Sequence, residues 1–212
     1  MLDQMKPPMK LSHVIYRGRT LDDAVHKFRE LGFHVEYGSK QEPHNALIYF
    51  SQGPYIELLA NAPLSSFAKL ALRVLGKRNV IERLGSWGEG PEGFFEICLE
   101  NYRDDFRLEK EILDRYGETY FTTKSKRLDE KNRLLKWKLL FPDTLELPFL
   151  MTYFNIDPKP AEFVHPNGIK GIKNVSYGTD VEMFPMLEEL CDDPILSWFE
   201  GRGFGAVEYE TV

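Results

Sequence analysis

Residues 11–32 read LSHVIYRGRTLDDAVHKFRELG, and this stretch decides the fold. Its first eight residues alternate as a strand does. Thr20, with Asp23 three residues later, resembles a capping box that starts a helix, and Gly32 supplies a C-terminal stop. Between them, apolar residues recur at helical spacing. The stretch therefore predicts a strand followed by a helix.

Three further strands are expected after this helix. Two β-rich runs, FHVEYGSK (33–40) and HNALIYF (44–50), are separated by a turn-forming stretch that ends at Pro43. The tight connection Ser51–Pro54 leads into YIELLA (55–60). The first unit is thus predicted to be βαβββ.

The same order of elements returns later in the chain. It reads GFFEICLEN (93–101), YRDDFRLEKEILDRYG (102–117), ETYFTTKSK (118–126), RLLKWKLLF (133–141) and LPFLMTYF (147–154). A third start, GIKNVSYGTDVEMFPMLEELC, covers 171–191 and is too short to be complete. Repeats of one supersecondary unit constrain the whole architecture. We predict an α+β fold in which paired βαβββ modules form a curved mixed sheet around a shared cleft.

The repeats also divide the chain. We expect a first module at 1–61, a helical connector at 62–92, a second module at 93–155 and a partial third unit at 156–212 packed on the sheet. In the connector, the apolar residues from Phe67 to Leu75 fall on one helical face. We interpret it as a connecting helix across the sheet edge. A mobile lid and an oligomer contact, which would make a homodimer, stay open as alternatives.

Composition excludes several classes of protein. The chain has 212 residues, and its net charge of −6 argues against general nucleic-acid binding. The N-terminus lacks the apolar stretch of a signal peptide, and no window is long enough to span a bilayer. Only Cys98 and Cys191 are present, too few for a disulfide framework. We expect a cytoplasmic protein without a membrane partner.

Strand alternation sorts residues between the two faces of the predicted sheet. In the first module it turns His13 and Ile15 toward the concave side, together with Tyr55, Glu57 and Leu59. In the second module it turns Glu96, Cys98, Leu150 and Thr152 inward and Met151 and Tyr153 outward. Lys136 and Lys138 are expected to point inward or to solvent.

At these residues the chain is similar to the vicinal oxygen chelate superfamily, which includes glyoxalase I, extradiol dioxygenases and fosfomycin- and bleomycin-resistance proteins. More narrowly, it resembles the glyoxalase-like domain group. The matching pieces are SHVIYRGRTLDDAVHKFRELGF, PHNALIYF, YIELLA, LLKWKLLFPD, LPFLMTYF and HPNGI. The resemblance covers nearly the whole chain from Leu11 onward.

The resemblance implies four positions for metal ligands, on the first and fourth strands of each module. His13 matches the first and Glu57 the second, which makes both candidate ligands of a divalent metal as well as candidate catalytic residues. The third falls on Cys98 and the fourth on Thr152, where a carboxylate is expected. Neither the ligand set of a hard divalent ion nor that of dioxygenase iron is complete. A buried, unreactive thiol is the alternative for Cys98.

Other residues are candidates for contact with a small-molecule ligand. Tyr55 and Glu96 line the predicted cleft. His44 and Asn45 open the third strand, where they reach the cleft mouth or stabilise a turn. Lys136 and Lys138 could pair with a carboxylate or phosphate, or be solvated. His165 begins a predicted turn, and it either stabilises that turn or contributes to the ligand site.

Two functions of different kinds follow from this set. The first is a lyase-like or related enzyme that acts on a small oxygen-rich, anionic molecule, with His13 and Glu57 holding a divalent metal or exchanging protons. The second is a non-catalytic protein of the same fold that binds or sequesters a small compound. The missing ligand positions favour the second function. An assembly scaffold that uses the connecting helix is a third, weaker interpretation.

Overall fold

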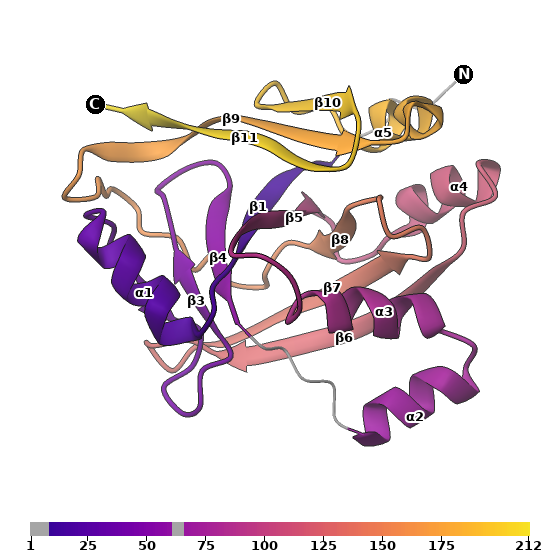
Figure 1. The fold of residues 1–212 in the computed structure, drawn as a ribbon, viewed down its shortest axis with the longest axis horizontal. Coiled ribbons are helices and arrows are strands. Elements are labelled where there is room, and N and C mark those ends of the chain that lie inside the picture. Colours follow the sequence, from indigo (N-terminus) through magenta and orange to yellow (C-terminus); the bar gives the residue numbers. More distant parts are fainter. Residues whose placement is uncertain (1–8, 61–65) are drawn as a thin grey trace.

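The computed structural model describes residues 9–60 and 66–212 (Figure 1). The first module consists of β1 (Lys10–Arg17), α1 (Leu21–Glu30), β2 (Glu36–Tyr37), β3 (Asn45–Ile48) and β4 (Tyr55–Leu59). The Thr20 hydroxyl accepts a hydrogen bond from the Asp23 N–H, and Gly32 follows the helix with φ at 81°. Both signals that predicted the helix ends are confirmed.

Two helices connect the modules, α2 (Ser66–Val74) and α3 (Arg78–Ser86). The second module then consists of β5 (Gly93–Asn101), α4 (Arg107–Arg115), β6 (Tyr120–Leu128), β7 (Leu134–Pro142) and β8 (Phe149–Thr152). Helix α2 was predicted, although the side chain of Phe67 lies outside the described part. The sequence specified one helix within the predicted helical connector at 62–92, and the structure has α3 as a second one.

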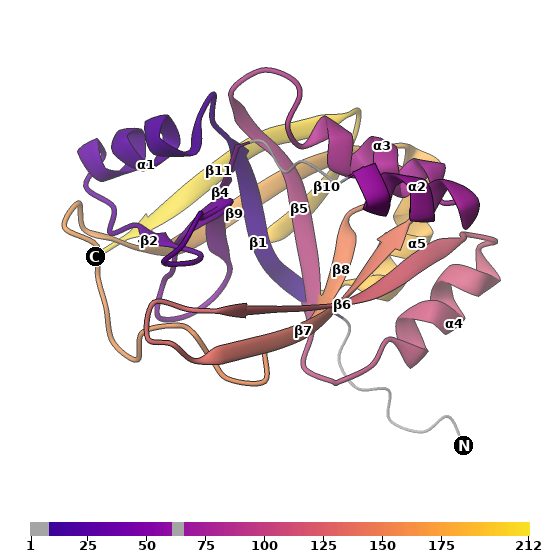
Figure 2. The same ribbon diagram turned by 90° about the horizontal axis from the view of Figure 1, so that it is seen from below.

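One sheet joins the two modules in the order β2-β3-β4-β1-β5-β8-β7-β6. The first strands of the modules, β1 and β5, pair antiparallel at its centre, and each pairs in parallel with the last strand of its own module. This sheet and its helices confirm the predicted α+β fold with a curved mixed sheet (Figure 2).

The sheet curls until residues near its two end strands touch. The Arg127 guanidinium of β6 donates to the Gly38 carbonyl at 2.8 Å and to the Tyr49 hydroxyl at 2.7 Å. The Tyr37 N–H of β2 donates to the Glu130 carboxylate. Hydrogen bonds thus link β6, at one end of the sheet, to residues in and near β2, at the other end. These bonds close the curl around the concave face.

The concave face carries its own buried cluster, which we call the inner cluster. It gathers apolar side chains from strands of both modules and from the two connecting helices: Ile15, Leu47, Tyr49, Tyr55, Leu59, Leu72, Val80, Cys98, Leu135, Phe141, Phe149, Met151 and Phe154. Val80 belongs to α3, so this second connecting helix packs inside the curl. Packed side chains therefore fill much of the hollow expected from the sequence.

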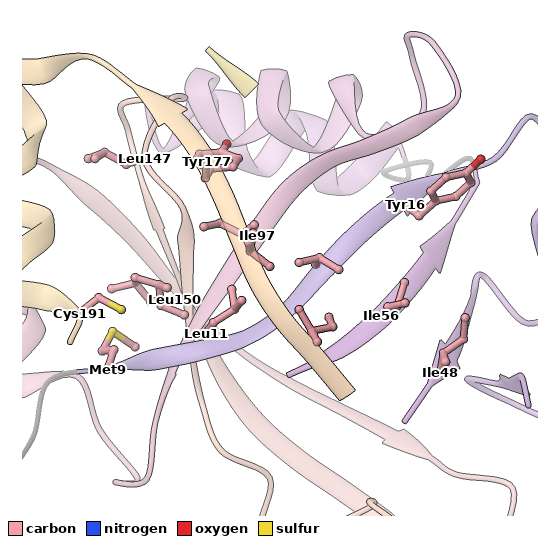
Figure 3. Close-up of a cluster of buried hydrophobic side chains, with 14 of the residues drawn as sticks. Met9, Leu11, Tyr16, Ile48, Ile56, Ile97, Leu147, Leu150, Tyr177 and Cys191 are labelled. Carbon is pink, nitrogen blue, oxygen red and sulfur yellow. The ribbon is translucent and has the colours of Figure 1, made fainter. Parts of the chain in front are cut away.

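The opposite face of the sheet packs into a larger outer cluster with α1, α4 and the C-terminal segment. Figure 3 shows part of it: Met9, Leu11, Tyr16, Ile48, Ile56, Ile97, Leu147, Leu150, Tyr177 and Cys191. Burying one such side chain stabilises the fold by about 1.5–3 kcal/mol. The outer cluster is therefore the main core.

The third unit forms a separate sheet in the order β10-β9-β11 (Figure 1). Its elements are β9 (Ile169–Thr179), a 3-10 turn (Val181–Met183), α5 (Phe184–Leu190), β10 (Leu196–Glu200) and β11 (Gly203–Thr211). Strand β10 was not predicted. The Met9 N–H donates to the Leu190 carbonyl, and the Leu11 N–H donates to the Asp193 carboxylate. The start of the described chain is thus joined to the third unit.

In the described part of the chain, none of the helices has both the length and the hydropathy that crossing a bilayer requires.

Candidate acid–base site

His13 and Glu57 meet on the concave face. Residues of β1 and β4 pair in parallel, with His13 beside Tyr55 and Ile15 beside Glu57. His13 Nε2 lies 3.2 Å from Glu57 Oε2. The imidazole side chain is 3% exposed and the carboxylate side chain 17%, so Glu57 is the member that solvent or a ligand reaches. Alternation along the strands predicted that both face this side.

The surroundings of Glu57 keep its carboxylate ionised. Burial raises the pKa of Glu57, but the contact with His13, a hydrogen bond from Asn45 and the charge of Arg127 together hold it below its usual range. The Asn45 amide donates to Oε1 at 2.6 Å. Asn45, a sequence candidate, therefore belongs to the site, while its neighbour His44 is exposed.

The imidazole of His13 is held on three sides. It stacks on the Tyr55 ring at 4.6 Å between centroids, and Phe149 packs at its edge. Its Nδ1 lies 3.1 Å from the Ser12 hydroxyl. The contact between Nε2 and Glu57 does not have the geometry of a hydrogen bond. Among the described residues, this buried nitrogen therefore has no hydrogen-bond partner.

Next to His13, a chain of polar side chains links β1 to β5 and the residue that follows it. The Ser12 hydroxyl donates to Glu100 Oε2 at 2.7 Å, and the Tyr102 hydroxyl donates to Glu100 Oε1 at 3.3 Å. Burial raises the pKa of Glu100, while Lys159 and Ser12 lower it less. Glu100 was not among the candidate residues predicted from the sequence, where the only indication of its role is an acidic residue inside the apolar strand FFEICLEN.

Cys98 sits beside His13 in the antiparallel pairing of β1 and β5. It is fully buried in the inner cluster, and its thiol donates to the Leu99 carbonyl. Burial, followed by the charges of Glu100 and Glu57, raises the pKa of the thiol well above its usual value. A metal ligand would have to be a thiolate. These surroundings favour the unreactive thiol.

The predicted orientation of β8 is wrong. Cys98 pairs with Phe149 as His13 pairs with Tyr55, so the residue equivalent to Glu57 is Met151. Phe149 and Met151 belong to the inner cluster, with Tyr153 packed against it, and Leu150 to the outer one. Thr152 shares the parity of Leu150 and instead accepts a hydrogen bond from the Lys138 N–H. All four residues of β8 are buried, so no polar alternation marked its inner face.

Lys136 and Lys138 do not join the dyad. Their neighbours Leu135, Trp137 and Leu139 contribute to the inner cluster, so alternation turns the lysines to the other face. Glu96 is also engaged elsewhere, since it pairs with Arg83 of α3 at 3.0 Å and accepts a hydrogen bond from Tyr177.

His165 lies in an aromatic pocket away from these groups. Its ring packs against Phe33, Phe50 and Phe163, and its Nδ1 accepts a hydrogen bond from the His34 N–H at 2.9 Å. Burial lowers the pKa of His165 to about 4. These contacts are those of a neutral structural histidine.

The donor set at the dyad does not fit a resident metal ion. In the described part of the chain, His, Cys, Asp and Glu side chains nowhere gather in a group of three or more. His13 and Glu57 would have only a protonated thiol and the Met151 thioether as neighbours at the remaining positions. Catalytic zinc sites use three protein ligands, and hard ions require oxygen donors.

Comparisons with known proteins place this geometry in context. A family model described as a glyoxalase-like domain matches residues 11–191. Comparison with curated proteins gives no match. Among solved structures, a hypothetical protein from Staphylococcus aureus has a TM-score of 0.62 and 17% identity, covering 92% of this chain and 88% of that chain. This similarity shows the fold alone.

Two other solved structures have weaker similarity. A methylmalonyl-CoA epimerase from Mycobacterium tuberculosis has a TM-score of 0.42 and 16% identity, covering 74% of this chain and 95% of that chain. A catechol 2,3-dioxygenase has a TM-score of 0.45 and 10% identity, covering 87% of this chain and 58% of that chain.

Proposed function

The chain belongs to the glyoxalase-like domain family, and from this premise we propose that it catalyses proton transfer on a small oxygen-containing molecule at Glu57 and His13. The observation that carries the proposal is the 3.2 Å approach of the two side chains on the concave face, with the carboxylate as the accessible member. General acid–base catalysis needs such a positioned group within reach of the substrate.

In the proposed reaction, Glu57 is the proton acceptor. A C–H bond next to a carbonyl group breaks, its electron pair moves to the carbonyl oxygen to form an enolate, and the proton passes to Oε2. Return of the proton to carbon completes an isomerisation or exchange. Ser12 and Tyr55 hold the His13 ring, and His13 positions the Glu57 carboxylate. No metal takes part in this step.

We expect the purified protein to lack stoichiometric divalent metal, because the dyad offers two suitable ligands where three are usual. Elemental analysis of the parent protein, after incubation with zinc and manganese and then gel filtration, measures this. Metal retained at one ion per chain, and lost in both His13→Ala and Glu57→Ala, would replace the proton-transfer mechanism with a metal-dependent one.

A second candidate is a non-catalytic binding protein of the same fold. Two observations favour it. The inner cluster packs the concave face, and both carboxylate oxygens of Glu57 already contact other side chains, Asn45 and His13. A carboxylate that only receives ligand hydrogen bonds would give binding without exchange of carbon-bound hydrogen.

Deuterium uptake separates the two functions. We expect the protein to speed exchange into at least one of three probes in D₂O, observed by proton NMR: pyruvate, dihydroxyacetone, and the adduct of methylglyoxal with glutathione. Glu57→Gln should slow that exchange at least tenfold because an amide cannot accept the proton. Glu30→Gln is the matched control, since Glu30 also contacts a histidine, His26, but lies exposed on α1.

Failure of the parent protein to exchange all three probes, combined with saturable binding of one of them, would support the binding protein instead. Equal exchange rates in the parent and Glu57→Gln would remove Glu57 from the mechanism.

A further inference from the structure

A second, chemically different hollow lies in the second module, along β6, β7 and the end of β8. It has a volume of about 770 Å³ and is lined by Tyr102, Arg103, Asp104, Lys124, Ser125, Lys126, Lys136, Trp137, Lys138, Thr152, Tyr153, Phe154 and Asn155. We call it the lysine groove. Small-molecule pockets typically measure about 300–1,000 Å³, so its size suits a compact ligand.

Four lysines of the groove stand directly opposite one another. In the antiparallel pairing of β6 with β7, Lys124 faces Lys138 and Lys126 faces Lys136. Cross-strand partners share one face of a sheet, so all four ammonium groups lie on the same side. Like charges directly opposite each other destabilise a sheet. The pairing of lysines with lysines is therefore unfavourable for the sheet itself.

The charges of these lysines are not neutralised locally. Within the described part of the chain, none of the four forms an ion pair with a carboxylate. Lys138 instead donates to the backbone carbonyl of Asp104. The protein as a whole carries a net charge of −6, so the groove has the opposite sign to the molecule around it. Such a site attracts anions.

Protection of a sheet edge explains only half of this pattern. Strand β6 ends the eight-stranded sheet, and lysines on an edge strand prevent pairing with other chains. Strand β7 lies one place inside the edge, between β6 and β8, yet it carries Lys136 and Lys138. A ligand for all four positive charges accounts for both strands.

Aromatic rings stand beside the lysines. Tyr102 is 69% exposed, and its ring centroid lies 5.1 Å from that of the half-buried Tyr153. An exposed ring next to cations suits a ligand that combines a planar base with phosphate groups, because bases stack on aromatic side chains. A neighbouring hollow of about 390 Å³ shares Lys124 and Lys138 and adds Lys110. It lengthens the positive surface.

We propose that the lysine groove binds a nucleoside polyphosphate, with the phosphates on the lysines of β6 and β7 and the base on Tyr102. The proposed ligand would bind through residues other than His13 and Glu57. The ligand class follows from charge, size and the exposed ring together.

Calorimetric titration of the full chain with ADP tests the proposal. We expect saturable binding of one ADP, weakened as salt is added, and at least tenfold weaker binding by the double variant Lys124→Gln/Lys136→Gln. The control Lys40→Gln/Lys173→Gln removes the same charge from exposed lysines outside the groove and should bind as the parent does. Absence of saturable binding, or equal losses in both double variants, would overturn the proposal.

Two further measurements test the ligand class. Tyr102→Ala should weaken ADP binding at least fivefold and leave inorganic pyrophosphate binding unchanged, because pyrophosphate has no base to stack. If pyrophosphate binds the parent as tightly as ADP, the nucleoside part of the proposal is wrong. A polyglutamate peptide that binds the groove more tightly than ADP would overturn the small-ligand proposal in favour of an acidic protein partner.

Discussion

Replacing Arg83 with methionine is expected to lower the free energy of unfolding by about 3–5 kcal/mol, the usual effect of breaking a buried ion pair from one side. The Arg83 side chain is 1% exposed, and Nη1 lies 3.0 Å from Glu96 Oε2. It also donates to the carbonyls of Leu147 at 2.9 Å and Thr144 at 2.7 Å. The variant leaves the Glu96 carboxylate buried without its cation. Urea unfolding followed by circular dichroism measures the loss.

A matched control distinguishes burial from charge. Arg115→Met removes an arginine from an exposed ion pair with Glu189, and we expect a much smaller change, because solvent screens such pairs. The double variant Arg83→Met/Glu96→Met should regain most of the lost stability, since no unpaired charge remains. A small effect of Arg83→Met, similar to that of Arg115→Met, would show that Arg83 does not anchor α3.

Acidification is expected to destabilise the protein through His165. Burial holds its folded pKa at about 4, below the unfolded value of 6.5. Its contribution to stability is therefore complete above pH 6.5, is lost as the pH falls toward 4, and changes little below that. The loss amounts to about 3 kcal/mol, because one pKa unit corresponds to about 1.4 kcal/mol.

His165→Asn tests this loss, since asparagine does not titrate and its side-chain oxygen can still accept the hydrogen bond from the His34 N–H. The free energy of unfolding, measured at pH 7 and pH 4, should fall by about 3 kcal/mol more in the parent protein than in the variant. Carboxylates that titrate in both proteins cancel in this difference. Parallel pH profiles would show that His165 is protonated without cost in the folded state.

The elements that strong local signals define were predictable from the sequence. The Thr20 cap and Gly32 predicted the ends of α1, and the alternation of β1 and β4 predicted that His13 and Glu57 share one face. A bulge in β1 at Ser12 could have inverted this assignment. It shifts the register between Leu11 and His13, so the parity beyond it holds.

Where both faces of an element are buried, alternation carries no information. This is why β8 was assigned the wrong inner face. Helix α3 lies within the predicted helical connector but was not recognised as a second helix, because Arg83 fixes it through contacts with residues distant in the sequence. Glu100 was missed for a related reason, since its partners Ser12 and Tyr102 come together only in the folded sheet.

The joining of Met9 to Leu190 and of Leu11 to Asp193 has a consequence for how the protein is made. A ribosome delivers β1 first and its C-terminal partners about 180 residues later, so the central strand waits through most of synthesis with Leu11 uncovered. Contacts this distant in sequence slow folding. During translation, the apolar surface around Leu11 lacks these partners until residues 190–193 have emerged, and apolar surface exposed in this way favours aggregation.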